Sequence, residues 1–185
     1  MQGDATRWDD RYRTSSPADP RPPDVFDHHP ELLEFVPRAG VAIDIACGLG
    51  HQTLWLAERG LDVVALDVSP VAIERLDDAS RALGLTASID ARVTDLEVGL
   101  PADPVRADVI VCQRFRQPAL YPQIVDRLAI GGLAVVTVLS IVGADAPGSF
   151  HAPAGELDTA FSRSDVDLLH AHEGDGTATV VFRRS

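Results

Sequence analysis

A short apolar run that leads into two glycines constrains the fold of this chain more than any other feature. Residues 41–46 (VAIDIA) are apolar except for Asp44, and Gly48 and Gly50 follow directly. A continuous apolar run of this length, bounded by glycines, is typical of a buried parallel strand. The residues after it, 51–59, predict a helix. The segment therefore predicts a strand–turn–helix unit, whose turn lies at the sheet edge where ligands bind.

The same alternation continues along the chain and ends in a hairpin. Further buried strands are predicted at residues 62–66, 87–93, 108–112 and 133–139, and helices at 30–36, 70–83 and 121–129. Two alternating segments, 166–170 and 177–182, flank the turn at residues 174–176 (GDG), as in an antiparallel hairpin. The pattern predicts an α/β fold with a doubly wound, Rossmann-like sheet of seven strands, mostly parallel with a C-terminal antiparallel hairpin.

We expect residues 1–185 to form one domain, since domains generally have roughly 100–200 residues. Residues 41–185 form its sheet core, and residues 1–30 form an N-terminal segment that covers the ligand cleft as a lid. Residues 8–12 (WDDRY) predict a short helix. The four prolines within residues 17–23 predict an extended or mobile stretch after it.

The hydropathy of the chain indicates no membrane segment. No apolar run approaches the roughly 18 residues that a membrane helix needs, and the first residues are polar rather than those of a signal peptide. We therefore expect a soluble, cytoplasmic protein that has no membrane partner. The two cysteines, Cys47 and Cys112, are too few for a disulfide framework and are expected to be free and buried.

The charge of the chain excludes several classes of function. The chain has 16 basic and 28 acidic residues, a formal net charge of −12, and all of its basic residues are arginine. Without lysine it cannot perform Schiff-base chemistry or use the lysine of a phosphate-binding loop. Its negative charge repels nucleic acids and fits small neutral or cationic substrates better.

Two acidic residues near the glycine turn indicate which ligand it binds. Asp67 lies 17 residues after Gly50, at the end of the next strand, where a carboxylate can accept hydrogen bonds from both ribose hydroxyls. A dinucleotide turn needs a third glycine where this chain has Thr53. Asp44 suits a cationic ligand such as S-adenosylmethionine (SAM), which carries an ammonium and a sulfonium. The pattern favours SAM over NAD as the cofactor.

A third acidic residue extends this pattern. Asp95 follows the third predicted strand, in the sequence Thr94-Asp95-Leu96-Glu97. Its carboxylate could accept a hydrogen bond from the adenine amino group. The alternative is a solvated loop residue.

These motifs together resemble the class I SAM-dependent methyltransferases, and most closely the small bacterial members related to the tellurite-resistance and thiopurine methyltransferases. The resemblance covers nearly the whole chain. It is carried by residues 8–12 (WDDRY), 44–51 (DIACGLGH), 55–60 (WLAERG), 66–69 (LDVS), 95–97 (DLE) and 127–132 (RLAIGG).

The resemblance implies a set of cofactor contacts and a function. Asp44 and the backbone at Ala46, Gly48 and Gly50 would hold the methionine part of SAM, and Asp67 the ribose. Val68 and Leu96 would flank the adenine, with Asp95 at its edge. The backbone at Cys112 and Gln113 would face the ammonium and methyl groups, and Trp8 and Arg11 the methionine carboxylate. The implied function is methyl transfer to a small-molecule acceptor by a monomer or homodimer.

The chain also departs from the family pattern. His51 stands where the family has a further glycine, the helix between the third and fourth strands is nearly absent, and residues 140–155 are short. The alternative function is therefore a catalytically weak or inactive module that binds SAM or its product S-adenosylhomocysteine (SAH), as a sensor or partner subunit.

The groups that would act on the acceptor are less defined. Candidate general bases are His28, His29 and His151, and the alternative for each is a surface loop histidine. Arg114 and Arg116 could hold an acidic substrate. His170 and His172 would share one face of a strand, but zinc needs further ligands, so no metal site is predicted.

Overall fold

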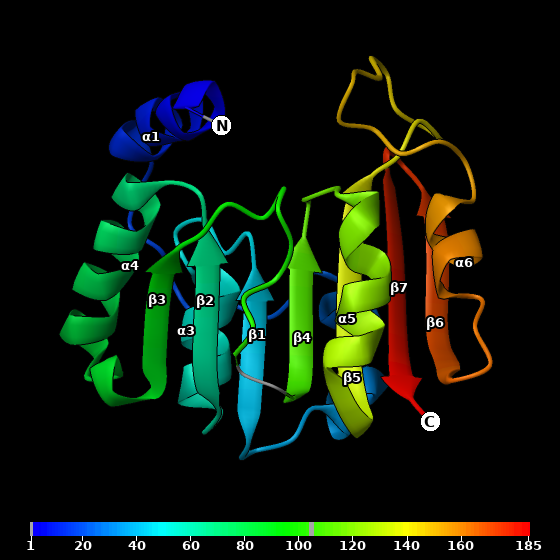
Figure 1. The fold of residues 1–185 in the computed structure, drawn as a ribbon, viewed down its shortest axis with the longest axis horizontal. Helices are drawn as coiled ribbons and strands as arrows, with labels where there is room; N and C mark the ends of the chain where they lie inside the picture. Colours follow the sequence, from blue (N-terminus) through cyan, green and yellow to red (C-terminus); the bar gives the residue numbers. More distant parts are fainter. Residues whose placement is uncertain (1, 104–105) are drawn as a thin grey trace.

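A single sheet organises residues 2–103 and 106–185, the part of the chain that the computed structural model describes. Its seven strands have the order β3-β2-β1-β4-β5-β7-β6 (Figure 1). They are β1 (Val41–Ile45), β2 (Asp62–Asp67), β3 (Ile89–Val93), β4 (Ala107–Gln113), β5 (Leu128–Leu139), β6 (Val166–Gly174) and β7 (Thr177–Arg184). Strands β1 to β5 pair in parallel, and β7 pairs antiparallel with both β5 and β6. The predicted fold class is confirmed.

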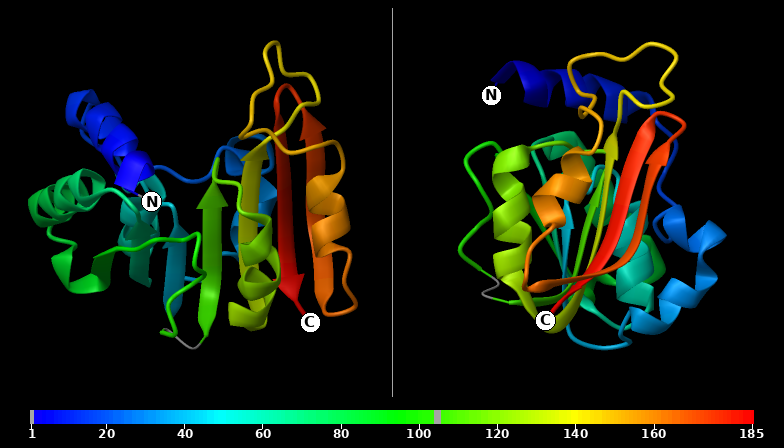
Figure 2. Two further views of the ribbon diagram at one scale, coloured as in Figure 1. Left: turned by 45° about the horizontal axis from the view of Figure 1, so that its top comes forward. Right: turned by 90° about the vertical axis from the view of Figure 1, so that its right-hand side faces the viewer.

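Helices cover both faces of the sheet. They are α1 (Gln2–Thr14), α2 (Val25–His28), α3 (His51–Glu58), α4 (Pro70–Leu83), α5 (Tyr121–Arg127) and α6 (Glu156–Phe161), with 3-10 helices η1 (Pro30–Phe35), η2 (Thr86–Ser88) and η3 (Pro118–Leu120). Helices α5 and α6 lie on one face, and α2, η1 and α3 lie on the other (Figure 2). Helix α1 lies apart from both layers, beyond the carboxyl ends of the parallel strands.

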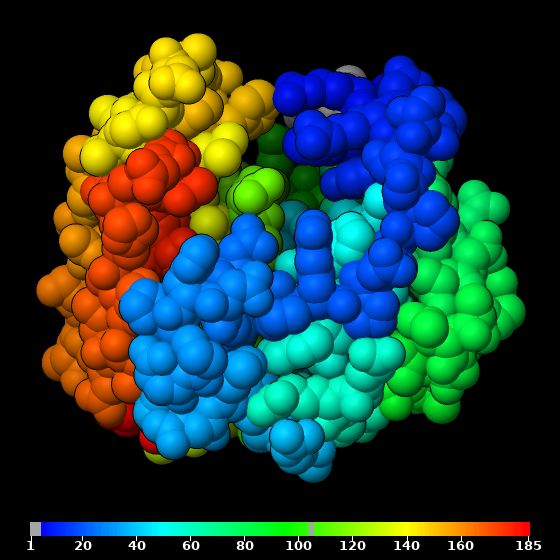
Figure 3. Space-filling view, turned by 180° about the vertical axis from the view of Figure 1, so that it is seen from behind, coloured from blue at the N-terminus to red at the C-terminus, as the bar shows by residue number. Residues whose placement is uncertain are grey.

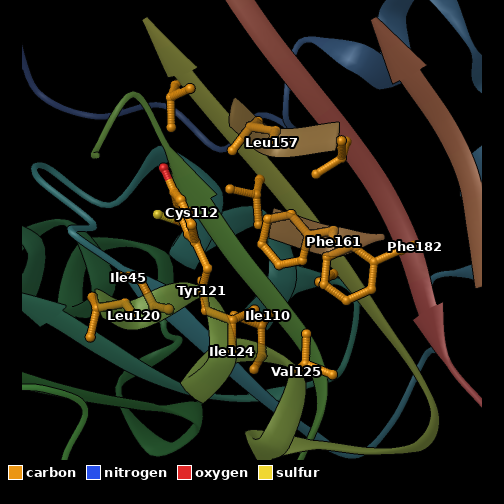
Figure 4. Close-up of a cluster of buried hydrophobic side chains, with 14 of the residues drawn as sticks. Ile45, Ile110, Cys112, Leu120, Tyr121, Ile124, Val125, Leu157, Phe161 and Phe182 are labelled. Atoms are coloured by element: carbon orange, nitrogen blue, oxygen red, sulfur yellow. The ribbon is translucent and has the colours of Figure 1, made fainter. Parts of the chain in front are cut away.

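Burial on both faces explains why the central strands are apolar at consecutive positions. In β4, Val109 and Val111 pack in the cluster under η1 and α3, whereas Ile110 and Cys112 pack in the cluster under α5 and α6. Successive side chains of a strand point to opposite faces, so a strand covered on both sides needs no polar alternation. Figure 4 shows the second cluster, where the rings of Phe161 and Phe182 have centroids 4.7 Å apart.

The C-terminal hairpin has the geometry that its turn sequence predicts. Asp175 and Gly176 connect β6 to β7, and both have positive φ, 50° and 77°. Two residues of positive φ form the turn whose twist matches that of antiparallel strands. The hairpin places β7 beside β5 and leaves β6 at the edge of the sheet.

Several element boundaries differ from the prediction. Helix α5 ends at Arg127, and β5 begins at Leu128 rather than at residue 133. Leu128 is fully buried and pairs with Ala107 at the start of β4, so the chain becomes extended there. The N-terminal helix is also longer than residues 8–12, and the segment after the prolines contains α2, which was not predicted.

The centre of the sheet is expected to dominate stability. Ile110→Ala removes a fully buried side chain in β4, and we expect it to lower the free energy of unfolding by about 2–5 kcal/mol. Ile130→Ala in β5 is the matched control, because that side chain is 74% exposed; its effect should be within about 0.5 kcal/mol. Urea denaturation measures both, and equal losses would contradict the packing described here.

Candidate functional site

A cavity of about 790 Å³ lies at the carboxyl ends of the parallel strands. Figure 3 shows the hollow between the N-terminal segment, in blue, and the loop after β5, in yellow. Its volume is within the range of small-molecule sites, about 300–1,000 Å³. Ten of the twelve residues predicted to bind the cofactor line it: Trp8, Arg11, Asp44, Ala46, Gly48, Asp67, Val68, Asp95, Leu96 and Gln113.

The turn after β1 forms the floor of this cavity and has an unusual backbone. Ala46, Gly48 and Gly50 have φ angles of 56°, 54° and 87°. Such angles are costly for residues other than glycine. A Cβ atom at Gly48 would lie 2.9 Å from the hydroxyl of Tyr12, and a Cβ at Gly50 would collide with Leu76 of α4. The absence of a side chain at Gly48 thus permits Tyr12 to lie close to the turn, whereas Gly50 packs against Leu76, away from the cavity.

Asp67 connects the turn after β1 with the helix after β2. Its Oδ2 accepts a hydrogen bond from the backbone N–H of Gly48 at 2.8 Å, and its Oδ1 accepts one from that of Ser69 at 2.9 Å. The side chain is 4% exposed, and burial raises the pKa of its carboxyl above the ordinary value. A carboxylate has about four acceptor positions, so Asp67 keeps capacity for a ligand that enters the cavity.

Asp44 is the other buried carboxyl group of the cavity. It is 1% exposed, and Thr53 Oγ1 donates a hydrogen bond to its Oδ2 at 2.5 Å. Burial is the main cause that raises its pKa to about 7. A cation bound nearby would favour the ionised form and lower this pKa. Thr53, which stands where a dinucleotide turn needs glycine, thus supplies a hydroxyl that donates a hydrogen bond to the Asp44 carboxylate.

Helix α1 covers this part of the cavity through contacts with α4. Asp9 Oδ1 accepts hydrogen bonds from Ser69 Oγ at 2.5 Å and from the backbone N–H of Val71 at 3.3 Å. A carboxylate at the N-terminus of a helix is stabilised by its unpaired N–H groups and by its dipole. The guanidinium of Arg75 also donates to the backbone oxygen of Tyr12.

Tyr12 is a cavity residue that the sequence interpretation did not select. Its ring stacks on that of Trp8 with centroids 5.7 Å apart, and both line the cavity. Burial raises the pKa of the Tyr12 hydroxyl, so it stays protonated and can donate a hydrogen bond. The spacing of Trp8 and Tyr12, four residues apart on a predicted helix, was the available signal, because it places both rings on one face.

The segment between α1 and α2 passes over the start of α3. His51 Nδ1 lies 2.8 Å from the backbone oxygen of Asp19, and the N–H of Arg21 donates to the backbone oxygen of His51 at 3.1 Å. His51 also lines the cavity. The histidine that replaces a glycine of the family motif therefore connects the N-terminal segment to the sheet core.

The three candidate bases lie outside the lining of the cavity. His28 is exposed on α2. The ring of His29 lies 4.2 Å from that of His170, and its Nδ1 lies 3.2 Å from a carboxylate oxygen of Glu31. His151 accepts a hydrogen bond from the N–H of Gly148 within its own loop. The tertiary structure does not bring these rings to the cofactor residues.

The chain turns sharply after β4. Arg114 has a φ of 57°, and its guanidinium pairs with Asp24 at 3.3 Å. Arg116 makes a bidentate pair with Glu156, which also accepts a hydrogen bond from the Tyr121 hydroxyl at 2.7 Å. This network raises the pKa of Arg116 and occupies its guanidinium.

The two remaining predicted residues of this region differ in orientation. The Gln113 amide donates to the backbone oxygens of Cys112 and Val135, at 3.2 and 3.3 Å, and its side chain lines the cavity. The Cys112 side chain instead packs in the core, and burial raises the pKa of its thiol. Cys112 could reach a ligand through its backbone alone.

No group of three or more His, Cys, Asp or Glu side chains in the described part of the chain is arranged to hold a metal ion. None of the described helices is both long and apolar enough to cross a membrane.

Comparisons with known proteins agree with this geometry. Residues 42–132 match a family of methyltransferase domains. The chain is 33% identical over 85 residues, 43% of its length, to the 2-heptyl-1-hydroxyquinolin-4(1H)-one methyltransferase of Mycobacteroides abscessus, of which it covers 37%.

Solved structures show the same fold at low sequence identity. TehB from Haemophilus influenzae superposes with a TM-score of 0.71 at 21% identity, over 86% of this chain and 62% of TehB. An S-adenosylmethionine-dependent methyltransferase from Clostridium acetobutylicum superposes with a TM-score of 0.66 at 13% identity, over 85% of this chain and 89% of that structure. The chain thus spans less than two thirds of both the curated relative and TehB.

The raised pKa of Asp44 predicts a dependence of stability on pH. Its ordinary value is 3.8 and its value in the fold is about 7, so the folded state holds a proton that the unfolded chain has lost between these values. The stability that Asp44 contributes therefore falls as pH rises through this window. Asp44→Asn does not titrate, so it should gain roughly 2–3 kcal/mol relative to the unsubstituted chain between about pH 5 and about pH 8.

Urea denaturation at the two pH values measures this difference. Asp62→Asn, at the exposed start of β2, is the control and should follow the pH dependence of the unsubstituted chain. Parallel curves for Asp44→Asn and the unsubstituted chain would show that Asp44 is already ionised in the fold.

Proposed function

We propose that this chain, a class I SAM-dependent methyltransferase by its fold and by the family match of residues 42–132, transfers a methyl group from SAM to a small-molecule acceptor. The observation that carries the proposal is the pair of buried carboxyl groups, Asp44 and Asp67, in one cavity on either side of the glycine turn. A cation and a ribose are the ligand groups that such a pair suits.

Different residues around the cavity bind different parts of the cofactor. Asp44 and the backbone of Ala46 and Gly48 hold the methionine part, and Asp67 holds the ribose hydroxyls; Gly50, which packs away from the cavity, shapes the turn. Val68 and Leu96 flank the adenine, and Asp95 accepts from its amino group. Trp8 and Arg11 approach the methionine carboxylate from α1, and the backbone at Cys112 and Gln113 lies near the methyl group. Tyr12 completes this set from above the glycine turn.

The protein contributes position and exclusion of water rather than a reactive group of its own. SAM, when bound, supplies the electrophilic methyl carbon and the sulfur that leaves. In-line displacement needs the acceptor atom behind that carbon, so the walls of the cavity must hold both molecules in line. Closure by α1 strengthens the polar contacts inside because it removes water.

A small molecule is the acceptor that the charge and the shape favour. The cavity is lined by residues of α1 and of the loop after β5, which border the hollow in Figure 3. A chain with a net charge of −12 repels polyanions. The name of the curated relative from Mycobacteroides abscessus, a quinolone methyltransferase, supports the same class of acceptor.

The second candidate function is a SAM- or SAH-binding module without catalysis. The observation that favours it is the position of His28, His29 and His151 outside the cavity lining. Incubation with methyl-labelled SAM and a panel of thiols, phenols and metalloid oxyanions separates the two functions. Formation of SAH and a labelled product supports the enzyme, and tight SAH binding without turnover supports the module.

Replacement of Asp67 tests the cofactor assignment. Asp67→Ala removes two charge-assisted hydrogen bonds to the ribose, each worth about 1.5–3 kcal/mol, so we expect the Kd for SAH to rise at least tens-fold. Calorimetry measures the Kd, and circular dichroism shows whether the variant is folded. Asp62→Ala, at the exposed opposite end of the same strand, should bind SAH normally. Unchanged affinity in folded Asp67→Ala, or binding of NADH without SAH, would refute the assignment.

The contact between α1 and α4 supports a role for the N-terminal segment as a lid over the cofactor. We expect SAH to slow amide exchange of residues 5–15, because the ligand adds contacts to Trp8, Arg11 and Tyr12. Asp9→Ala breaks the contact with Ser69 and Val71, so it should speed exchange there and weaken SAH binding about five- to tenfold.

The matched control is Asp10→Ala. Asp10 is exposed and pairs with Arg13 on the same helix, so its loss should leave exchange and affinity unchanged. Equal exchange of residues 5–15 with and without SAH would mean that α1 is a fixed structural element.

A further inference from the structure

We infer that the contact between His29 and His170 is an acid-sensitive switch, which holds the segment α2–η1 against the edge strand β6 at neutral pH and releases it when both rings are protonated. The two histidines lie outside the lining of the cavity. Release acts on the cavity through residues 15–24, which connect α1 to α2. Only this effect on ligand binding rests on the proposed function; the contact itself does not.

The two imidazole rings contact each other directly. Their centroids lie 4.2 Å apart, and their planes are tilted by 46°. His29 follows α2 and precedes η1, whereas His170 lies in β6, so the contact joins elements that are far apart in the sequence. Both residues are half-buried. Protons can therefore reach the rings from solvent while the rings are packed together.

A β-bulge turns His170 toward this segment. Alternate residues of a regular strand share a face. In β6, however, Leu168 is opposite Phe182 and His170 is opposite Val181, because the register shifts between them. Phe182 packs under α5 and α6, and Val181 packs under η1 and α3. The bulge thus places His170 on the face that η1 covers (Figure 2), as bulges commonly redirect a side chain.

The contacts of the segment with α3 do not change charge with pH. Phe26 of α2 is 3% exposed, and its ring lies 5.9 Å from that of Trp55. Leu32 of η1 is buried in the same apolar cluster. Protonation of the histidines therefore leaves this side of the segment packed and frees the side that faces β6. The expected change is a local opening rather than unfolding.

The surroundings of the two rings balance one positive charge but not two. The titratable groups that act on His170 are His29 and Glu31 from α2–η1 and its neighbour on β6, His172. Strand β7 places Val181 opposite His170 and a threonine opposite His172, and neither titrates. Glu31 Oε1 lies 3.2 Å from His29 Nδ1, so this carboxylate can balance one protonated ring. A second proton places two like charges at the distance of a ring contact, where they repel.

The environment of His170 gives the direction of the pH dependence. Burial, together with His29 and His172, lowers the pKa of His170 from its ordinary value of 6.5. As pH falls below 6.5, the unfolded chain takes up this proton before the folded chain does. The stability that the neutral ring contributes is therefore complete above pH 6.5 and is lost as pH falls toward the lowered pKa. Histidine clusters commonly change an interface in this way at about pH 5–6.

The segment that the two histidines hold is connected to the cavity. Asp24, directly before α2, pairs with Arg114 at 3.3 Å. The backbone N–H of Arg21 donates to the backbone oxygen of His51 at 3.1 Å. All four residues line the cavity. Opening of α2 loosens the chain that carries Asp24 and Arg21, so a ligand in the cavity should bind less tightly in acid.

Amide exchange of residues 25–31 tests the switch at about pH 7.5 and about pH 5.5, with each rate corrected for intrinsic exchange at that pH. In the unsubstituted chain we expect protection to fall at least about fivefold in acid. His170→Phe keeps a ring beside His29 but takes up no proton, and a single charge on His29 is attracted to an aromatic face. Its protection should therefore differ less than about twofold between the two pH values.

His28→Gln is the matched control. His28 is exposed on α2, directly before His29, so this variant should keep the full acid response. His29→Phe should lose the response as His170→Phe does, and it replaces that variant if circular dichroism shows that His170→Phe is unfolded. An equal acid response in the unsubstituted chain and in the folded phenylalanine variant, or loss of the response in His28→Gln, would overturn the switch.

Calorimetric Kd values for SAH at the same two pH values test the connection to the cavity. Protonation of Asp44, whose pKa is about 7, weakens cofactor binding in acid equally in every variant. The ratio of the Kd in acid to the Kd at about pH 7.5 should therefore be at least about threefold larger in the unsubstituted chain and His28→Gln than in His170→Phe. Equal ratios would overturn the connection. Absence of SAH binding at both pH values would refute the proposed function instead, and amide exchange would still decide whether the switch exists.

Discussion

The two hydrogen bonds that the Asp67 carboxylate accepts are the interactions on which the structure around the cavity depends. It accepts hydrogen bonds from Gly48 in the turn after β1 and from Ser69 at the start of α4. The turn after β1 and the turn after the neighbouring strand β2 are thereby held together. The same carboxylate faces the cavity, so the group that would recognise a ribose also maintains the shape of the site around it. Replacement of Asp67 should therefore affect both ribose binding and the shape of the site.

The start of α4 connects the cavity to helix α1, which lies over it. Ser69 donates hydrogen bonds to Asp67 from its backbone N–H and to Asp9 of α1 from its hydroxyl, so α1 is linked through Ser69 to the carboxylate that holds the glycine turn. Tyr12 lies over Gly48, where a larger residue would displace it. The proposed closure of the cavity would therefore use the same few groups that are proposed to bind the ligand, and the position of α1 should then respond to occupancy of the site.

Two buried carboxyl groups dominate the electrostatics of one side of the cavity. Burial raises the pKa values of Asp44 and Asp67, and a cationic ligand would relieve that cost.

The sequence by itself determined the sheet and the residues at its strand ends, because both follow from local patterns. Runs such as residues 41–46 are apolar at consecutive positions only when both faces of a strand are covered, and an acid directly after such a run must lie at the carboxyl edge. Asp67 and Asp95 were placed in this way, whereas Asp44 lies inside the run, near its carboxyl end. Only the tertiary structure decided the start of β5 at Leu128, the contact of Asp9 with α4, the ion pair of Arg116 with Glu156 and the position of His28, His29 and His151 outside the cavity lining. Each depends on which distant segments meet, and hydrophobic periodicity carries no information about hydrogen bonds between residues 40 or 60 positions apart.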